Sequence, residues 1–286
     1  MGGLIGCGEI HWTLSHMPEQ RFEAIDDGRG FDWGRTSADY DRFRPGPPDS
    51  FYTRLQSFEI GLASQRLLDV GTGTGLLARR FAAQGVATCG SDISEAQIAM
   101  AISSAEREGL KIDYQVAGAE SLPYADDSFD VVTANQCWMY FDLSETIPEV
   151  CRVLKPDGCL LVSHFSFMPR LDPIVAASER LVLEHNPDWG GADWNGYLAA
   201  EPDWSIDTFE LIGFFAYDEQ IPFTRESWRG RMRALRGIAA SLDSDQVAVF
   251  DREHEALLEQ LTGNEFQIWH RIHSQIFRPR SQAGRD

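Results

Sequence analysis

The feature that most constrains this chain is a glycine-rich turn between an apolar run and a helical stretch, LLDVGTGTGLLARRFAAQG from Leu67 to Gly85. Gly71, Gly73 and Gly75 stand at every second position of the turn. Because glycine has no Cβ, such a turn lets the backbone bend sharply and approach a small molecule closely. A helix that begins directly after the turn presents free N–H groups to the same molecule. The turn alone does not identify its ligand, since several unrelated classes of nucleotide-binding protein have similar loops.

The spacing of the glycines differs from that of two known fingerprints. In the dinucleotide-binding fingerprint the third glycine comes three residues after the second, whereas here Gly75 comes two residues after Gly73. A Walker-type phosphate loop ends in Lys-Ser or Lys-Thr, and no such pair follows Gly75. The loop therefore matches neither a dinucleotide fingerprint nor a Walker loop.

A second candidate binding element follows the next apolar run. In GSDIS, Asp92 stands at the expected carboxyl end of a strand. A carboxylate there can accept hydrogen bonds from both hydroxyls of a ribose, as it does in dinucleotide enzymes. The alternative role for Asp92 is to cap the helix that begins after Ser94. Together with the glycine turn, Asp92 favours an adenosine-type ligand without deciding which one.

Short apolar runs alternate with helical stretches between Arg66 and Phe165. The runs expected as strands are RLLDV, VATCGSD, KIDYQVA, FDVVTAN and CLLVSHF, and the expected helices are 76–84, 94–108 and 145–154, the last closed by KPDG. This alternation is typical of a parallel sheet that is covered by helices. It predicts an α/β fold with a Rossmann-like doubly wound sheet and helices on both faces.

The alternation stops after Met168. A helical stretch at 172–185 is followed by an aromatic and glycine-rich segment. The remaining candidates are strands at 214–223 and 266–277 and helices at 225–240 and 244–261. We expect the two late strands to pair, so that a mostly parallel sheet gains an antiparallel edge strand.

Composition argues against several classes of function. The formal net charge of -19, from 44 acidic and 25 basic residues, opposes a nucleic-acid partner. No stretch approaches the roughly 18 uncharged apolar residues of a membrane span, and the first residues lack the pattern of a secretion signal. The five cysteines are odd in number and form no CxxC pair. We therefore expect a cytoplasmic protein with no metal site that binds neither nucleic acid nor membrane.

Four segments in order carry a resemblance to a known family. LLDVGTGTG, GSDIS, AGAESLPYADDSFDVVTANQ and EVCRVLKPDGCLLVS resemble the successive motifs of class I S-adenosylmethionine-dependent methyltransferases. Within that class they are most similar to the small-molecule branch, methyltransferase type 11-like, that includes the ubiquinone and menaquinone C-methyltransferases. The resemblance covers residues 31–165, and it implies S-adenosyl-L-methionine as cofactor and a small-molecule methyl acceptor.

The resemblance implies a role for each residue of the glycine turn. Gly71, Thr72 and Gly73 would lie under the methionine part of the cofactor, and Gly75 would complete the loop. Asp69 would order this loop from the end of the preceding strand. These five residues are the predicted methionine-binding part of the cofactor site.

Other matching positions would hold the adenosine. Asp92 would bind the ribose, and Ile93 would pack on the adenine. Ala119 and Glu120 would border the edge of that ring.

Two further segments are expected near the reacting methyl group. Asn135 and Gln136, directly after the fourth strand, would face the methionine end of the cofactor. The upstream segment FDWGRTSADYDRFRPG resembles one that precedes the core in this branch, so Tyr40 would cap the sulfonium side. Arg44 would pair with the methionine carboxylate. The alternatives are a core role for Tyr40 and a solvated Arg44.

The expected reaction is an in-line displacement, which requires the acceptor to be held close to the methyl carbon and water to be excluded. An acceptor that must lose a proton needs a general base, and His164, late in the fifth strand run, is the candidate catalytic residue. A structural histidine is the alternative reading. The segment 135–138, Asn-Gln-Cys-Trp, departs from the signature of enzymes that methylate amino groups of adenine or glutamine. The sequence leaves open whether oxygen, nitrogen, carbon or sulfur is methylated.

The expected domain organisation has two parts. Residues 1–34 form a leader, either a lid or partly disordered, and residues 35–286 form one methyltransferase domain with an inserted substrate-covering segment at about 167–205. Aromatic residues are expected to wall the acceptor site, namely Trp138, Tyr140, Phe141, Trp189, Trp194 and Tyr197. The oligomeric state is not indicated. Two alternative functions stay open, an NAD-dependent oxidoreductase and a non-catalytic cofactor-binding scaffold.

Overall fold

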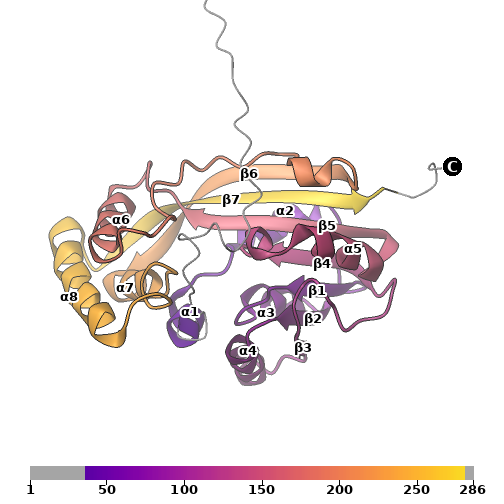
Figure 1. Ribbon diagram of the computed structural model, residues 1–286, viewed down its shortest axis with the longest axis horizontal. Helices are drawn as coiled ribbons and strands as arrows, with labels where there is room; N and C mark the ends of the chain where they lie inside the picture. The colour runs from indigo at the N-terminus through magenta and orange to yellow at the C-terminus, as the bar shows by residue number, and fades with distance from the viewer. Residues whose placement is uncertain (1–35, 281–286) are drawn as a thin grey trace, which may run out of the picture.

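The computed structural model describes residues 36–280, so the predicted leader at 1–34 lies outside the described residues. The strands form one seven-stranded sheet in the order β3-β2-β1-β4-β5-β7-β6 (Figure 1). They are β1 (Arg66–Val70), β2 (Ala87–Asp92), β3 (Asp113–Val116), β4 (Phe129–Asn135), β5 (Leu154–Phe167), β6 (Phe209–Thr224) and β7 (Glu265–Pro279). β1 to β5 pair in parallel, while β7 is antiparallel to both β5 and β6. The predicted Rossmann-like sheet, mostly parallel with an antiparallel pair at one edge, is confirmed.

Helices cover both faces of this sheet. They are α1 (Ser37–Phe43), α2 (Asp49–Gln56), α3 (Leu76–Ala83), α4 (Glu95–Arg107), α5 (Leu143–Val153), α6 (Pro173–His185), α7 (Arg225–Arg233) and α8 (Ser244–Leu261). Successive strand residues point to opposite faces of a sheet. In β1, Leu67 shares a core cluster with Phe51 of α2 and Phe81 of α3, whereas Leu68 clusters with Val150 of α5. The apolar runs of the strands are therefore buried from both sides.

Some element boundaries differ from the sequence prediction. The expected helix 225–240 ends at Arg233, and turns follow in which Gly237 lies against Trp189 too closely for a Cβ. KPDG does not separate a helix from a strand, because β5 already begins at Leu154, which pairs with Phe129. The residues of KPDG then form an irregularity in the pairing of β4 with β5. The late strands β6 and β7 are also longer than their apolar runs.

A second group of helices packs against the extended ends of β6 and β7 (Figure 1). The Trp228 indole of α7 donates a hydrogen bond to Ser178 of α6, and His254 of α8 lies 3.0 Å from the same hydroxyl. This buried network joins α6, α7 and α8. None of the helices within residues 36–280 has the length and apolar character required to cross a membrane.

Candidate functional site

The sheet order places a candidate site where the chain changes direction across the sheet. β1 continues outward to β2 and β3 on one side, while β4 and β5 lie on the other. In open α/β sheets, ligands bind at the carboxyl ends of the strands beside such a switch point. Here Gly71 follows β1 and Gln136 follows β4, so the glycine loop and the end of β4 meet at this place.

Two carboxylates hold the glycine loop in shape. Asp69 is buried, and its two oxygens accept hydrogen bonds from the hydroxyls of Thr72 at 2.6 Å and Thr133 at 2.7 Å. Burial raises the pKa of Asp69 to about 6, although both hydroxyls act to lower it. Asp92 accepts hydrogen bonds from the backbone N–H groups of Gly73 and Ser94, each at 2.9 Å. The structure thus brings Asp69, Thr72, Gly73 and Asp92 together.

Only one of the three loop glycines faces open space. All three have positive φ, at 61°, 56° and 79° for Gly71, Gly73 and Gly75. A Cβ on Gly71 would meet Cys137 Sγ at 2.8 Å, and one on Gly75 would meet the Tyr114 hydroxyl at 2.2 Å. A Cβ on Gly73 would meet nothing closer than a Gln97 oxygen at 3.8 Å. The loop therefore fits a ligand that passes over Gly73, as the predicted methionine part of the cofactor would.

Asp92 does not act as the helix cap that was its alternative role. The N-cap of α4 is Ser94, whose side chain accepts a hydrogen bond from the backbone of Gln97. Asp92 stands two residues earlier, is half-buried, and burial raises its pKa. Each carboxylate oxygen has a second lone pair beyond the backbone hydrogen bond that it accepts. Ribose hydroxyls can use that remaining capacity.

The adenine-edge residues lie at the ends of β2 and β3. Ile93 is 79% exposed, more than any other large hydrophobic side chain within residues 36–280. Ala119 is buried, and Glu120 accepts a hydrogen bond from the backbone of Asp142 at 3.1 Å. An exposed aliphatic side chain beside Asp92 suits an aromatic ring better than water. The adenine roles of these residues stay predictions.

The end of β4 is held in an unusual backbone conformation. Gln136 has a φ of 66°, which is uncommon for a residue with a side chain. Its backbone N–H donates to Ser163 of β5, and its side-chain amide donates to the carbonyl of Phe165. Asn135 accepts a hydrogen bond from Ser163 at 3.1 Å. These bonds fix the turn after β4 beside the carboxyl end of β5, and strain of this kind is common at functional sites.

α1 is tied to the glycine loop and to α7. Asp41, whose side chain is 12% exposed, binds Arg79 at 2.8 Å and Arg107 at 3.0 Å. Arg79 belongs to α3, and its backbone N–H donates to Gly75. On the other side, Asp39 pairs with Arg233 of α7 at 2.8 Å. The short helix that carries Tyr40 therefore bridges the loop and the second group of helices.

Tyr40 and Arg44 lie toward the ends of β4 and β5. The Arg44 guanidinium lies 4.8 Å from the centroid of the Tyr40 ring. The charge of Arg44 lowers the pKa of His164, after a larger effect of burial. Tyr40 and Arg44 both have small effects on the pKa of Tyr140, which follows β4. The structure thus groups the upstream segment with His164, and the contacts of Tyr40 and Arg44 with the cofactor stay predictions.

His164 is poorly suited to accept a proton in the state described. Its ring packs against Trp194, with centroids 4.9 Å apart. Burial, with the charges of Arg44 and His273, lowers the pKa of His164 to about 3. The imidazole is therefore neutral at pH 7 but is a weaker base than an exposed histidine. Its role as general base stays a prediction.

The aromatic residues expected around the acceptor have different environments. Trp138 and Trp189 are buried, and Trp138 packs against Trp204 at a centroid distance of 5.0 Å. Tyr197 is 70% exposed. Trp194, beside His164, is the one whose contacts best match a wall of the acceptor site.

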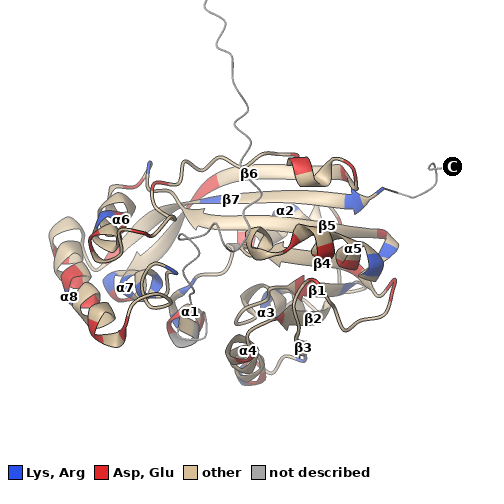
Figure 2. Ribbon diagram, in the orientation of Figure 1, with Lys and Arg blue, Asp and Glu red and all other residues tan. Residues whose placement is uncertain are grey.

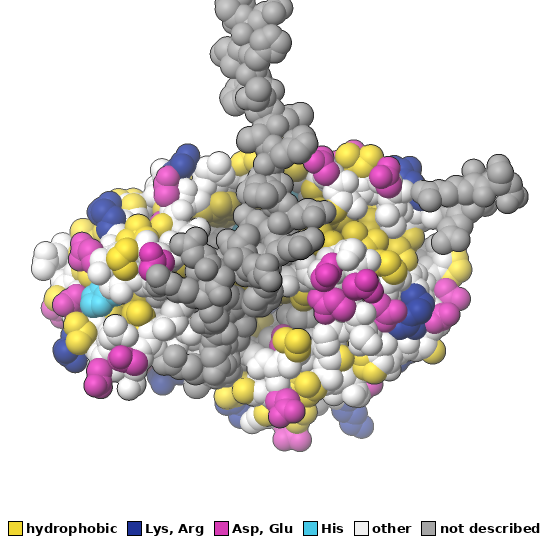
Figure 3. Space-filling view, viewed as in Figure 1, with side chains coloured by type: hydrophobic (Ala, Val, Ile, Leu, Met, Phe, Trp, Pro, Cys, Tyr) yellow, Lys and Arg dark blue, Asp and Glu magenta, His cyan; other side chains and the backbone are white. Residues whose placement is uncertain are grey.

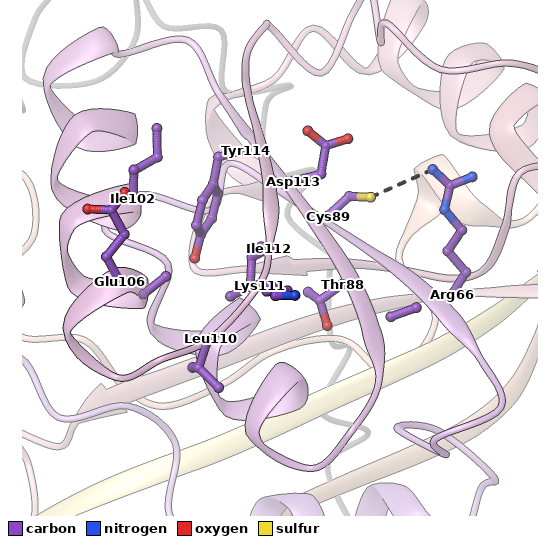
Figure 4. Close-up of a pocket in the computed structure, with 12 residues that line it drawn as sticks. Arg66, Thr88, Cys89, Ile102, Glu106, Leu110, Lys111, Ile112, Asp113 and Tyr114 are labelled. Carbon is purple, nitrogen blue, oxygen red and sulfur yellow. Dashed lines mark hydrogen bonds between the residues drawn. The ribbon is translucent and has the colours of Figure 1, made fainter.

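A surface pocket of about 580 Å³ lies elsewhere, at the amino ends of β2 and β3 (Figure 4). It is lined by the beginnings of β2 and β3 and by the end of α4, including Thr88, Asp113, Glu106 and Lys111. These are amino ends of parallel strands, where ligands of this fold do not bind. The pocket lacks the glycine loop, and we do not assign it to the reaction. Within residues 36–280, no three His, Cys, Asp or Glu side chains come together in a way that could hold a metal ion.

Two buried residues near the end of β5 were not among the predicted site residues. Arg231 of α7 and His270 of β7 are buried there, and the His270 ring stacks on Phe165 with centroids 4.8 Å apart. Arg231 lies over the ring of Phe167 at 5.1 Å. Neither residue belongs to a local motif, and only the late strands and α7 bring them beside β5. The sequence signal for Arg231 was its place beside apolar residues of the predicted helix, such as Trp228 and Met232.

Comparisons with known proteins agree with this geometry. The sequence pattern of a methyltransferase domain family matches residues 68–162. The uncharacterized methyltransferase YcgJ of Bacillus subtilis is 38% identical over 42% of this chain and 49% of its own length. The ubiquinone biosynthesis O-methyltransferase of Cereibacter sphaeroides is 31% identical over 64% of this chain and 74% of its own. The chain thus spans about half of the first relative and three quarters of the second.

A solved structure shows the same fold. It is a putative type II methyltransferase from Anaeromyxobacter dehalogenans, with a TM-score of 0.56 and 22% identity over 82% of this chain and 97% of its own. The ordered motifs, the sheet with its glycine loop and these relatives lead to one family. The chain belongs to the class I S-adenosylmethionine-dependent methyltransferases, of the type related to ubiquinone biosynthesis enzymes.

Proposed function

We propose that the chain transfers a methyl group from S-adenosyl-L-methionine to a small-molecule acceptor at the carboxyl ends of β4 and β5. The observation that carries the cofactor's position is the open space beside Gly73, next to the Asp92 carboxylate. In this proposal the loop from Gly71 to Gly75 holds the methionine part and Asp92 holds the ribose. When bound, the cofactor supplies an electrophilic methyl group on a positively charged sulfur.

The protein's contribution is positioning. Asp69 stabilises the turn through Thr72 and Thr133, so the loop backbone is already in place before a ligand binds. The turn after β4, fixed by Gln136, presents Asn135 toward the acceptor side. α1 covers this place and, with Trp194, excludes water from the displacement. No residue becomes covalently attached.

An oxygen acceptor is favoured among the four possible atoms. The relative from Cereibacter sphaeroides is named as an O-methyltransferase of ubiquinone biosynthesis. The low pKa of His164 favours an acceptor that does not depend on a strong base, such as a phenol that is acidic or already ionised. The excess of acidic residues supports a small molecule over nucleic acid, because the long polyanionic backbone of a nucleic acid would be repelled.

Calorimetry with three cofactors tests the proposal. We expect S-adenosylhomocysteine and S-adenosylmethionine to bind with one site per chain and NAD not to bind. Mass spectrometry of phenolic acceptors incubated with enzyme and S-adenosylmethionine then tests for the added methyl group. Binding of NAD alone would contradict the proposal, and cofactor binding with no turnover on any acceptor would support the scaffold alternative.

A further inference from the structure

The arginines of α7 divide into two faces. Figure 2 shows α7 with its blue residues beside α8, which carries many red ones. Arg225, Arg229 and Arg233 recur at every fourth position and so share one face of the helix. Each pairs with a carboxylate of α8, at 3.7 Å from Glu259 for Arg225 and at 2.5 Å and 2.6 Å from Asp251 for the other two. Every arginine on the face of α7 that packs against α8 therefore has a carboxylate partner on α8.

Arg231 lies on another face and has no such partner. It is 4% exposed, and its Nη1 atom has no hydrogen-bond partner among the described residues. The aromatic ring of Phe167 lies below its guanidinium. Within residues 36–280, the groups that influence the pKa of Arg231 after burial are Arg44 and Tyr40, and neither is a carboxylate. A buried cation without an anion destabilises the folded protein.

A second cation lies near the same place. The charge of Arg44 affects the pKa values of Arg231, His270 and His164, so Arg44, which follows α1, lies near these three residues of α7, β7 and β5. His270 adds no charge here, because burial lowers its pKa to about 3. Its ring is stacked between Phe165 and Phe223, at centroid distances of 4.8 Å and 5.8 Å. Arg44 and Arg231 therefore repel each other, and the side chain of Arg231 lies beside aromatic rings.

We propose that Arg231, with Arg44 beside it, binds an anionic group of the methyl acceptor, a carboxylate or a phosphate. This inference rests on the proposed function and names the chemical class of its acceptor. It replaces the predicted pairing of Arg44 with the methionine carboxylate. An anion between the two guanidinium groups would remove their repulsion and give Nη1 of Arg231 a hydrogen-bond partner. The aromatic rings around His270 and Phe167 suit a flat body attached to that anion.

The position of Arg231 favours the acceptor over the cofactor as the source of the anion. Phe167, below Arg231, ends β5, and β5 is the second strand from β1, which leads into the glycine loop. At a strand spacing of about 4.8 Å, the two strands lie about 10 Å apart. His270 belongs to β7, one strand farther away. We therefore expect the anion at Arg231 to lie apart from the methionine part over Gly73.

Matched probes test this anion site. The wild-type full chain, saturated with S-adenosylhomocysteine, is titrated with benzoate, with phenyl phosphate and with benzamide, which has the shape of benzoate but no charge. We expect at least one of the two anions to bind about tenfold or more tightly than benzamide. The ratio of benzoate to phenyl phosphate distinguishes a carboxylate acceptor from a phosphate acceptor.

Variants of one helix assign the effect to Arg231. Arg231→Met should weaken binding of the preferred anion by about tenfold or more and leave binding of benzamide unchanged. Arg225→Met removes the same charge from the α8-facing side of α7 and should leave anion binding unchanged. If Arg231→Met fails to fold, Arg231→Gln and the thermal shift of the wild-type protein by benzoate against benzamide replace it.

Three results would overturn the inference. The first is equal affinity of the wild-type protein for the anions and benzamide, or binding of none of them. The second is an Arg231→Met variant that binds the anion like wild type. The third is an Arg231→Met variant that loses S-adenosylhomocysteine, which would assign Arg231 to the cofactor carboxylate. Failure of the wild-type protein to bind S-adenosylhomocysteine would instead contradict the proposed function, and the anion titration can be repeated without it.

Discussion

The proposed cofactor side and the proposed acceptor side of the site differ in how their buried charges are satisfied. On the cofactor side (residues 69–75, 92–94 and 135–137), Asp69 and Asp92 accept hydrogen bonds from residues near them in sequence or on the next strand. On the acceptor side (Arg44, His164, Arg231 and His270), Arg231 is buried and its Nη1 atom has no partner among the described residues. The two carboxylates of the first side have hydrogen-bond partners without a ligand, whereas the second side has a charge that a ligand can neutralise.

The molecular surface sharpens this contrast. Figure 3 shows carboxylates over α4 and α5 on the face in view, in keeping with the net charge of -19. Against that acidic background, a buried arginine near a second arginine is an exception. The proposed anion site is therefore a local exception to the negative charge of the whole chain. The following four predictions test the difference between the two sides.

The largest effect is expected on the cofactor side, at Gly73. Gly73→Val should weaken S-adenosylhomocysteine binding by about 100-fold or more, ~2.7 kcal/mol, because the branched side chain would fill the open space. Gly109→Val is a matched control, since Gly109 has a φ of 70° and nothing within 4 Å of its added Cβ. Calorimetry should show that only the first variant loses the cofactor, while both lose similar thermal stability. Equal cofactor affinity in the two variants would mean that the loop is only a turn.

Asp92→Ala should have the next largest effect. Loss of charge-assisted hydrogen bonds to a ribose, worth about 1.5–3 kcal/mol, corresponds to a dissociation constant raised by about 10- to 150-fold. Asp157→Ala, which removes an exposed carboxylate from KPDG, is the control and should bind as wild type. An unchanged constant in Asp92→Ala would remove that residue from the site.

On the acceptor side, α7 carries Arg231 and packs with α6 and α8, and the stability of this group should depend on pH through His254 of α8. Its Nε2 atom faces Ser178, its Nδ1 atom lacks a partner among the described residues, and burial lowers its pKa to about 4. The unfolded chain, with a pKa near 6.5, binds more protons, so stability is complete above pH 6.5 and is lost as the pH falls toward 4. At pH 5 the loss is about 2 kcal/mol.

Urea unfolding of wild type and His254→Gln between pH 7 and pH 5 measures this loss. The difference in free energy of unfolding between the two proteins should shift in favour of the variant as the pH falls. Parallel curves would show that His254 does not titrate as described.

The smallest effect is expected from Arg231 itself in the absence of any ligand. Arg231→Met removes an uncompensated buried charge and should raise the free energy of unfolding by about 1 kcal/mol. The same substitution at Arg225, which faces Glu259, should not raise it. Urea unfolding of the two variants measures this difference. A large loss of stability in Arg231→Met would show that the described chain already compensates the charge.

The contrast between the two sides also explains what the sequence could predict. The strands of the parallel sheet, the glycine loop and Asp92 each leave a signal within a short stretch of sequence, so they could be predicted. β6 and β7 were predicted as an antiparallel pair, but their length was not, because exposed residues such as Phe214 and Trp269 alternate with buried ones only once the sheet exists. Arg231 joins Phe167 and Arg44 through tertiary packing alone. The acceptor side was therefore not predictable from any single stretch.

The most direct test of the account compares S-adenosylhomocysteine binding to wild type, Asp92→Ala and Arg231→Met by calorimetry. We expect a loss of about tenfold or more for Asp92→Ala and an affinity within about twofold of wild type for Arg231→Met. Wild-type affinity in Asp92→Ala, or a loss in Arg231→Met as large as the one expected for Asp92→Ala, would contradict the separation of the two sides.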